Sequence, residues 1–187
     1  MRKLSAAALL LLAGLCLSSA TLFAQQFSSQ QRAQELAASF NKSKHRVKER
    51  RGVRVEKFKE VRNEPVVKAD VREYAGTYVA SVGMDYPLKV AVASDGHVEV
   101  TGSELSKDGI LHFTLRDAKI DGGLLTGTKV YADGSTEKFE GVFINRTERD
   151  SPTAAGTTSF GLGVVYNPPR AESDFGFSLV HLFYQRQ

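Results

Sequence analysis

Short stretches in which apolar and polar residues alternate fill the chain from Val66 onward. In one of them, Leu88, Val90 and Val92 occupy every second position. A period of two is typical of a β-strand with one buried face. Eight strands are predicted on this basis: Thr77–Val82, Leu88–Ala93, His97–Thr101, Ile110–Ala118, Leu124–Ala132, Thr136–Asn145, Ser159–Tyr166 and Phe175–Tyr184.

Turn sequences separate most of these strands. Asp-Gly and related pairs supply the positive φ that tight hairpin turns need. Short strands at spacings near ten to twelve residues predict a mainly β fold, an antiparallel meander that closes into a roughly eight-stranded barrel or sandwich. The turn sequences are Ser94-Asp95-Gly96, Lys107-Asp108-Gly109, Asp121-Gly122-Gly123 and Asp133-Gly134-Ser135.

The segment from Gln25 to about Arg51 has a different pattern, with apolar residues three and four positions apart. This spacing predicts an amphipathic, basic N-terminal helix with one narrow apolar stripe. The last predicted strand is apolar on both faces, and the helix stripe is a candidate cover for it. Beyond Gly52 we expect a strand or an extended arm. The stripe consists of Ala33, Leu36, Ala37 and Phe40, and the arm contains Val53, Val55, Phe58 and Val61.

The first 24 residues have the layout of a secretory signal peptide, with a basic start, the 12 apolar residues Ala6 to Leu17, and a small residue at Ala24. The alternative is an N-terminal membrane anchor. We therefore predict residues 1–24 as a signal peptide, 25–64 as a basic helical arm with an extended linker, and 65–187 as an antiparallel β domain. The protein is expected to be exported to the periplasm or the extracellular space of a bacterium.

The cysteine content and the distribution of charge limit the chemistry and the partners that the chain can have. Cys16 is the single cysteine and lies in the apolar run, so the mature chain would hold no disulfide and no thiol nucleophile. Between Phe27 and Glu64 there are 11 Lys and Arg against 5 Asp and Glu, whereas Pro65 to Gln187 has 12 against 16. A basic arm thus joins an acidic body. The segment Lys42–Arg62 is a candidate contact for an anionic envelope surface, and export makes nucleic acid an unfavoured partner.

One hairpin resembles a known repeat. From Gly127, the sequence shows Tyr131, the turn Asp133-Gly134, the triplet Phe139-Glu140-Gly141 and the triplet Phe143-Ile144-Asn145. This order is similar to a MORN-type repeat. It appears once in full, whereas a MORN array needs several copies to bury its sheet. We interpret it as a shared hairpin pattern.

The wider chain resembles a lipocalin-like small barrel, since Tyr74-Ala75-Gly76-Thr77-Tyr78 opens the sheet and Asp-Gly turns follow. The resemblance implies an eight-stranded barrel with a ligand inside. The chain has no tryptophan for that family's Gly-x-Trp motif, so no ligand position is transferred from the family. The inner-face residues predicted here as candidate ligand contacts are Tyr78, Leu111, Phe113 and Phe143.

Candidate catalytic chemistry is sparse. His97 and Glu99 share a strand face, and His112 would complete a possible metal site if its strand lies alongside. The more ordinary interpretation is a set of solvent-facing polar residues. Ser159-Phe160-Gly161 does not match a nucleophile elbow, and no phosphate-binding loop is present. No cofactor is predicted, and nothing argues for an enzyme.

The leading hypothesis is an exported, non-enzymatic β-barrel protein that binds a small apolar ligand or a component of the cell envelope. One alternative is an eight-stranded outer-membrane barrel, against which the polar outward residues Lys89, His97, Glu99 and Thr101 argue. The other alternative is a metal-assisted hydrolase that uses the two histidines and the glutamate.

Overall fold

The computed structural model describes residues 28–80, 87–106, 109–166 and 180–187. In this part of the chain a helix covers residues 28–39 and ten strands follow it. Residues 1–24, predicted as a signal peptide, lie outside the described residues. So do residues 81–82 of the first predicted strand, 175–179 of the last, and 107–108 of one predicted turn. The remaining elements are β1 (Lys42–Arg50), β2 (Val53–Pro65), the 3-10 helix η1 (Val71–Tyr74), β3 (Gly76–Ala80), β4 (Leu88–Val92), β5 (Val98–Ser106), β6 (Gly109–Asp121), β7 (Leu124–Tyr131), β8 (Thr136–Arg149), β9 (Thr157–Tyr166) and β10 (Val180–Arg186).

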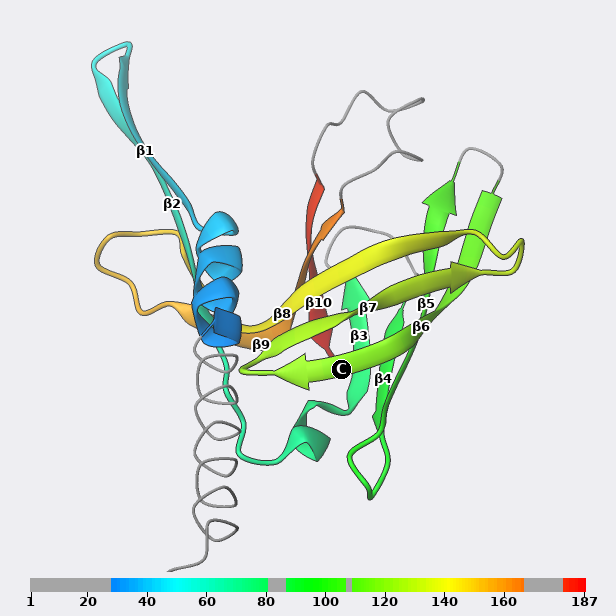
Figure 1. Cartoon of the computed structure of the whole chain (residues 1–187). Helices are drawn as coiled ribbons and strands as arrows, with labels where there is room; N and C mark the ends of the chain where they lie inside the picture. The colour runs from blue at the N-terminus through cyan, green and yellow to red at the C-terminus, as the bar shows by residue number, and fades with distance from the viewer. Residues whose placement is uncertain (1–27, 81–86, 107–108, 167–179) are drawn as a thin grey trace, which may run out of the picture.

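Eight of these strands, β3 to β10, form a closed antiparallel barrel (Figure 1). Each pairs with the next along the chain, β10 pairs with β3, and the β8–β9 pairing is part of the same ring. This is an up-and-down barrel, in which closure leaves no free edge within the ring. The eight predicted strands and the predicted fold class are therefore confirmed.

The long strand β8 is shared between the barrel and the preceding segment. Its first half pairs with β7 up to Val142, and its second half pairs with β2 from Ile144 onward. Phe143 lies between the two, donating its N–H to Gly123 O at 2.9 Å and accepting from Val66 N at 2.8 Å. A Cβ on Gly123, where φ is +84°, would lie 2.5 Å from Val66 O. Glycine at this position lets the β6–β7 turn approach the incoming chain.

A large cluster of apolar side chains lies inside the barrel. The Phe143 ring packs against Tyr74 and Tyr78, with ring centroids 4.4 and 5.7 Å away. The predicted alternation holds in β4, β5 and β6, with one exception at Asp117 (φ 55°), where a bulge shifts the register. Because of this extra residue, Ala118 and Ile120 pack against the same core as Phe113. The buried cluster contains Tyr74, Tyr78, Leu88, Val90, Val98, Val100, Phe113, Leu115, Leu125, Tyr131, Phe139, Phe143, Leu162, Val164 and Tyr184.

A side chain of the last strand, β10, holds the segment that leads into β3. Arg186 of β10 donates to the carbonyl oxygens of Glu73 at 3.1 Å and Ala75 at 2.7 Å. Its guanidinium also lies 5.8 Å from the centre of the Phe160 ring. These bonds supply donors to the carbonyl of Glu73, near the end of η1, and to that of the C-cap residue Ala75. They fix η1 against the end of the barrel.

The N-terminal helix packs on the outside of the barrel. Its predicted stripe is buried, and Phe40 is 2% exposed. A Cβ on Gly163 would lie 3.0 Å from the Phe40 ring, so the absence of a side chain in β9 makes room for this contact. Phe183 and His181 of β10 also lie against this segment, so the helix covers the outer face of the last strand, as predicted. The second buried cluster contains Ala33, Leu36, Ala37, Phe40, Leu124, Val142, Ile144 and Phe183.

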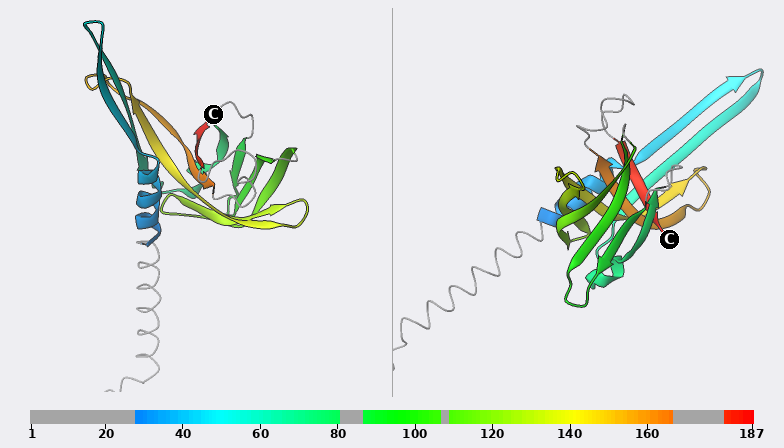
Figure 2. Two further views of the ribbon diagram at one scale, coloured as in Figure 1. Left: turned by 90° about the horizontal axis from the view of Figure 1, so that it is seen from above. Right: turned by 90° about the vertical axis from the view of Figure 1, so that its right-hand side faces the viewer.

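The prediction that the helix continues to about Arg51 is wrong. Lys42–Arg50 forms β1, which pairs with β2 as a two-stranded ribbon. The ribbon projects away from the barrel in both views of Figure 2. The described helix holds one arginine and one glutamate, so the basic residues of the arm lie in the ribbon. Among the described residues, no helix has the length and apolar character to cross a bilayer.

Phe40→Ala is expected to lower the free energy of unfolding by about 3 kcal/mol, because it removes the largest side chain of the helix–barrel contact. Urea denaturation followed by circular dichroism measures this change. Val47→Ala is the control, since Val47 is 46% exposed on the ribbon. Equal unfolding midpoints for the two variants would contradict the docking of the helix.

His181 gives a pH-dependent test of the same contact, since its ring meets the edge of Phe40 at 5.0 Å. Burial, followed by the charge of Lys42, lowers the pKa of His181 below 6.5. The unfolded chain then binds this proton more readily, so stability is lost as pH falls from about 6.5 through the folded pKa. His181→Gln is expected to reduce the loss of stability between pH 7.5 and 5.5, measured by urea midpoints. An unchanged loss, equal to that of the exposed control His97→Gln, would contradict this.

Candidate functional site

The ribbon is a regular hairpin with a two-residue turn. Arg51 (φ 54°) and Gly52 (φ 74°) both have positive φ, as a type I′ turn requires. Nine residue pairs follow, from Arg50 opposite Val53 to Lys42 opposite Val61. Because side chains alternate between the two faces of a strand, this register decides which charges lie together.

One face of the ribbon carries cations and no acidic residue. Lys44 lies opposite Lys59, Arg46 opposite Lys57, and Lys48 opposite Val55. Like charges directly opposite each other destabilise a strand pair. Alternate residues along a strand are about 7 Å apart, so these side chains form a double row of positive charge. We define the cationic face as Lys42, Lys44, Arg46, Lys48, Lys57 and Lys59.

The opposite face of the ribbon holds the contacts that stabilise it. His45 Nε2 lies 2.6 Å from Glu56 Oε1, and its ring meets Phe58 at 5.9 Å. Glu49 lies opposite Arg54. This face pairs opposite charges and apolar surface, while the other concentrates positive charge. The ribbon is thus asymmetric in charge across its thickness.

The positive charges of the cationic face are mostly uncompensated. Lys59 lies 3.7 Å from Glu148 of β8. Within the described residues, none of the other members of the face forms an ion pair. A pocket on this face is lined by Lys44, Arg46, Lys48, Val55 and Lys57. Several ammonium groups and one guanidinium group on this face could therefore contact the same anionic surface of a partner at once.

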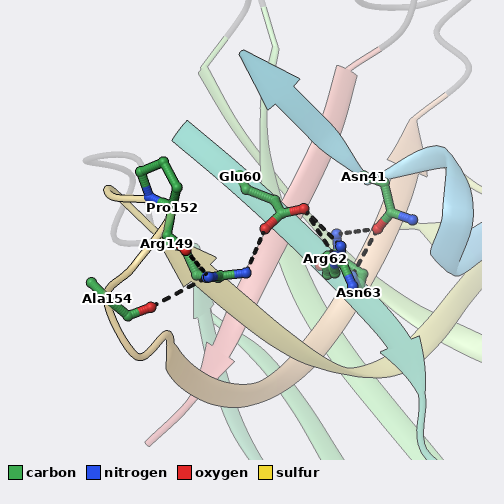
Figure 3. A network of polar contacts seen from close by, with 7 residues as sticks. All are labelled: Asn41, Glu60, Arg62, Asn63, Arg149, Pro152 and Ala154. Atoms are coloured by element: carbon green, nitrogen blue, oxygen red, sulfur yellow. Dashed lines mark hydrogen bonds and ion pairs between the residues drawn. The ribbon is translucent and has the colours of Figure 1, made fainter. Parts of the chain in front are cut away.

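The base of the ribbon is held to the barrel by a polar network (Figure 3). Asn63 donates through its backbone N–H to Asn41 Oδ1 at 2.7 Å, which ties the end of the helix to β2. Arg149 Nη1 donates to Glu60 Oε2 at 3.2 Å and also bonds to the carbonyl of Pro152 in the β8–β9 connection. Together with the β2–β8 ladder, these bonds set the direction in which the ribbon leaves the barrel.

The barrel interior is the second candidate site. The structure places Tyr78, Phe113 and Phe143 in the buried cluster, and Leu111 packs against that cluster. Tyr78 and Phe143 are 0% exposed and contact each other. These residues line the inner face as predicted. Their role in binding a ligand stays a prediction.

A charged cluster also lies inside the barrel, and the sequence did not suggest it. Lys129 is 2% exposed, and its Nζ lies 2.7 Å from Glu104 Oε2 and 3.3 Å from Glu137 Oε2. Tyr131 donates its hydroxyl toward the same two carboxylates, at 2.5 and 2.9 Å. Burial, then the bond to Glu104, raises the pKa of Tyr131, so its hydroxyl stays protonated as a donor. The cluster neutralises a lysine that the period-two alternation of β7 directs inward.

The predicted metal ligands do not come together. His97 Nε2 lies 4.0 Å from Glu99 Oε1, but His112 faces Ser103, two alternate positions further along β5 than Glu99. Among the described residues, no group of three side chains is arranged to hold a metal. The hydroxyl of Ser103 lies 2.8 Å from His112 Nδ1. This pair is exposed on the outer barrel surface and lacks the enclosed site that excludes water in covalent catalysis.

Sequence reasoning found the basic segment but assigned it to a helix. The available signal was the period of two in Lys42, Lys44, Arg46 and Lys48, which is a strand period. Comparison of the chain with protein-family models, with curated proteins and with solved structures gave no match.

Lys129→Met is expected to destabilise the barrel by about 3–5 kcal/mol, because it leaves Glu104 and Glu137 without their buried cation. Adding Glu104→Gln to Lys129→Met should cost less than the sum of the two single changes. Urea denaturation of the four proteins measures this. Lys119→Met is the matched control, since its side chain is 57% exposed and its loss should cost about 1 kcal/mol or less. Additive single changes would contradict a coupled cluster.

Proposed function

We propose that the protein is an exported, non-enzymatic, lipocalin-like barrel that attaches to an anionic component of the cell envelope through the cationic face of its ribbon. One observation carries this proposal: Lys44, Arg46, Lys48 and Lys57 are gathered on one exposed face with no acidic residue among them. The attachment is a binding function and needs no catalytic group.

The electrostatics of the ribbon support attachment. Pairing Arg46 with Lys57 and Lys44 with Lys59 places like charges opposite each other, which costs stability in the free protein. An anionic partner would relieve that repulsion on binding. Lysine and arginine near an anionic surface each contribute about 1 kcal/mol. The asymmetry between the two faces of the ribbon would also orient the barrel on its partner.

The sequence supports the location. The basic start, the apolar run Ala6 to Leu17 and the small residue Ala24 are typical of an exported chain. In the cell envelope, phosphate-bearing headgroups and polymers are the abundant anions, so a cationic face would meet them first. Nucleic acid is the less favoured partner there.

The barrel itself supports the lipocalin-like part of the proposal, because lipocalins are eight-stranded up-and-down barrels. Barrels of this size are filled by side chains or hold one small ligand. Here the candidate ligand contacts Tyr78, Phe113 and Phe143 pack within the core. For this reason we place attachment on the ribbon and assign the barrel the role of a rigid support.

The two alternatives receive less support. Lys89, Glu99 and Thr101 are exposed on the outer barrel face, where an outer-membrane barrel presents an apolar band. A metal-assisted hydrolase needs His97, Glu99 and His112 together, and their strands hold His112 apart from the other two.

The triple variant K44Q/R46Q/K48Q is expected to bind anionic vesicles about 3 kcal/mol more weakly than the natural protein, at about 1 kcal/mol per cation. The measurement is co-sedimentation of the mature protein, from Gln25, with vesicles of phosphatidylcholine containing phosphatidylglycerol. Binding should weaken as salt rises, because the charges are screened.

The control R116Q/K119Q/K138Q removes the same number of positive charges from the outer barrel face. It should bind the vesicles as the natural protein does. Equal weakening of both triple variants would show that net charge, and not the cationic face, drives binding. Undetectable binding of the natural protein to both anionic vesicles and long-chain polyphosphate would overturn the proposal.

A further inference from the structure

The outer end of the ribbon is apolar as well as basic. Val47, Val53 and Val55 are 46%, 62% and 42% exposed. They are three of the five large apolar side chains that are exposed among the described residues. The other two, Val67 and Ile110, are single residues elsewhere. Val53 and Val55 are alternate residues on the side of the ribbon that carries the cationic face, whereas Val47 lies on the opposite side, across from Glu56. Exposed apolar groups that gather at one place mark an interaction site, whereas scattered ones do not.

The valines and the cations are ordered along the ribbon. Val53 directly follows the turn residue Gly52, and Val55 lies opposite Lys48 on the cationic face. Arg46 and Lys44 come next toward the barrel on the same face. The ribbon projects well clear of the barrel, with its turn at the far end (Figure 2). A partner approaching that end meets the exposed turn residue Arg51 together with Val53, and Val55 and the cationic face lie behind them.

We infer that the partner of the ribbon is an anionic lipid bilayer, and that Val53 and Val55 enter the boundary between headgroups and acyl chains while the cationic face binds the headgroups. The inference rests on the proposed function and names its partner. Interfacial segments combine apolar side chains with lysine and arginine in this way. A dissolved polyanion would interact favourably with the cations but would leave the valines in water.

The backbone limits how deeply the ribbon enters. β1 pairs with β2 on one side and is an edge strand of the sheet, so its other side carries N–H and C=O groups without a strand partner. Such groups cannot be left unsatisfied in hydrocarbon. The ribbon therefore stays at the level of the headgroups, and only the side chains next to the turn pass below it. Lysine side chains reach back to the phosphates along their own length.

The chain has no tryptophan, which allows a direct test with one introduced reporter. Val53→Trp in the mature protein should show a blue-shifted emission when vesicles containing phosphatidylglycerol are added, and brominated lipids should quench it. Val67→Trp is the matched control, since Val67 is 56% exposed outside the ribbon, and its emission should not change. Emission of Val53→Trp that stays unshifted while the protein co-sediments with the vesicles would overturn insertion.

A second pair of variants separates insertion from charge. V53S/V55S should weaken vesicle binding about tenfold, as expected for removing partly buried methyl groups, and leave binding to long-chain polyphosphate unchanged. V67S/I110S should change neither. Equal loss of both kinds of binding in V53S/V55S would overturn the inference.

The two proposals fail in different ways. If K44Q/R46Q/K48Q loses binding to vesicles and polyphosphate alike while V53S/V55S binds both normally, the cationic face stands and insertion is wrong. If the natural protein binds neither probe, the proposed function itself is wrong.

Discussion

Strand β8 is the element on which the rest of the structure depends, because it pairs with three other strands. β7 and β2 share one edge of it, with the change at Phe143, and β9 occupies the other edge. The pairings of β8 with β7 and with β9 belong to the closed barrel, which encloses the aromatic core. The pairing with β2 gives the ribbon a rigid origin. A ribbon of two strands is marginal on its own in water, so its direction and order come from this one ladder and the polar network at its base.

The N-terminal helix and the barrel complete each other's surfaces. The helix stripe is too narrow to be stable alone, and β10 directs the apolar ring of Phe183 to the outer side of the barrel, where the helix helps to bury it. Two glycines of β9 allow the helix and the barrel to pack together. The missing side chain of Gly161 leaves room for the Phe183 ring, and that of Gly163 leaves room for the Phe40 ring. Arg32 of the helix adds a paired contact to Glu140 at 2.9 and 2.6 Å. The helix end, fixed by Asn41, then places the start of β1.

Charged side chains are arranged in opposite ways in the barrel and on the ribbon. Inside the barrel, Lys129 is surrounded by Glu104, Glu137 and Tyr131, so a buried charge is compensated at close range. On the ribbon, the opposite arrangement holds: cations face cations and lie in solvent. The ribbon tolerates that repulsion because its other face pairs His45 with Glu56. A local conflict of this kind, stabilised elsewhere, is expected at a functional site and supports the binding role proposed for the cationic face.

The sequence by itself determined the eight strands, the turns between them and the apolar stripe from Ala33 to Phe40, because these depend on the local periods of two and of three to four residues. It also determined that positive charge gathers before Pro65. Only the tertiary structure decided that Lys42–Arg50 is a strand. Six of its nine residues are Lys, Arg or Glu, which are good helix formers, but pairing with β2 supplies hydrogen bonds that intrinsic propensity does not count. The period of two within β1 places Lys42, Lys44, Arg46 and Lys48 on one face of that strand. The register with β2 adds Lys57 and Lys59 to the same face, and no local pattern contains a register between two strands. Barrel closure and the cluster around Lys129 likewise join residues far apart in the chain, so long-range packing alone could establish them.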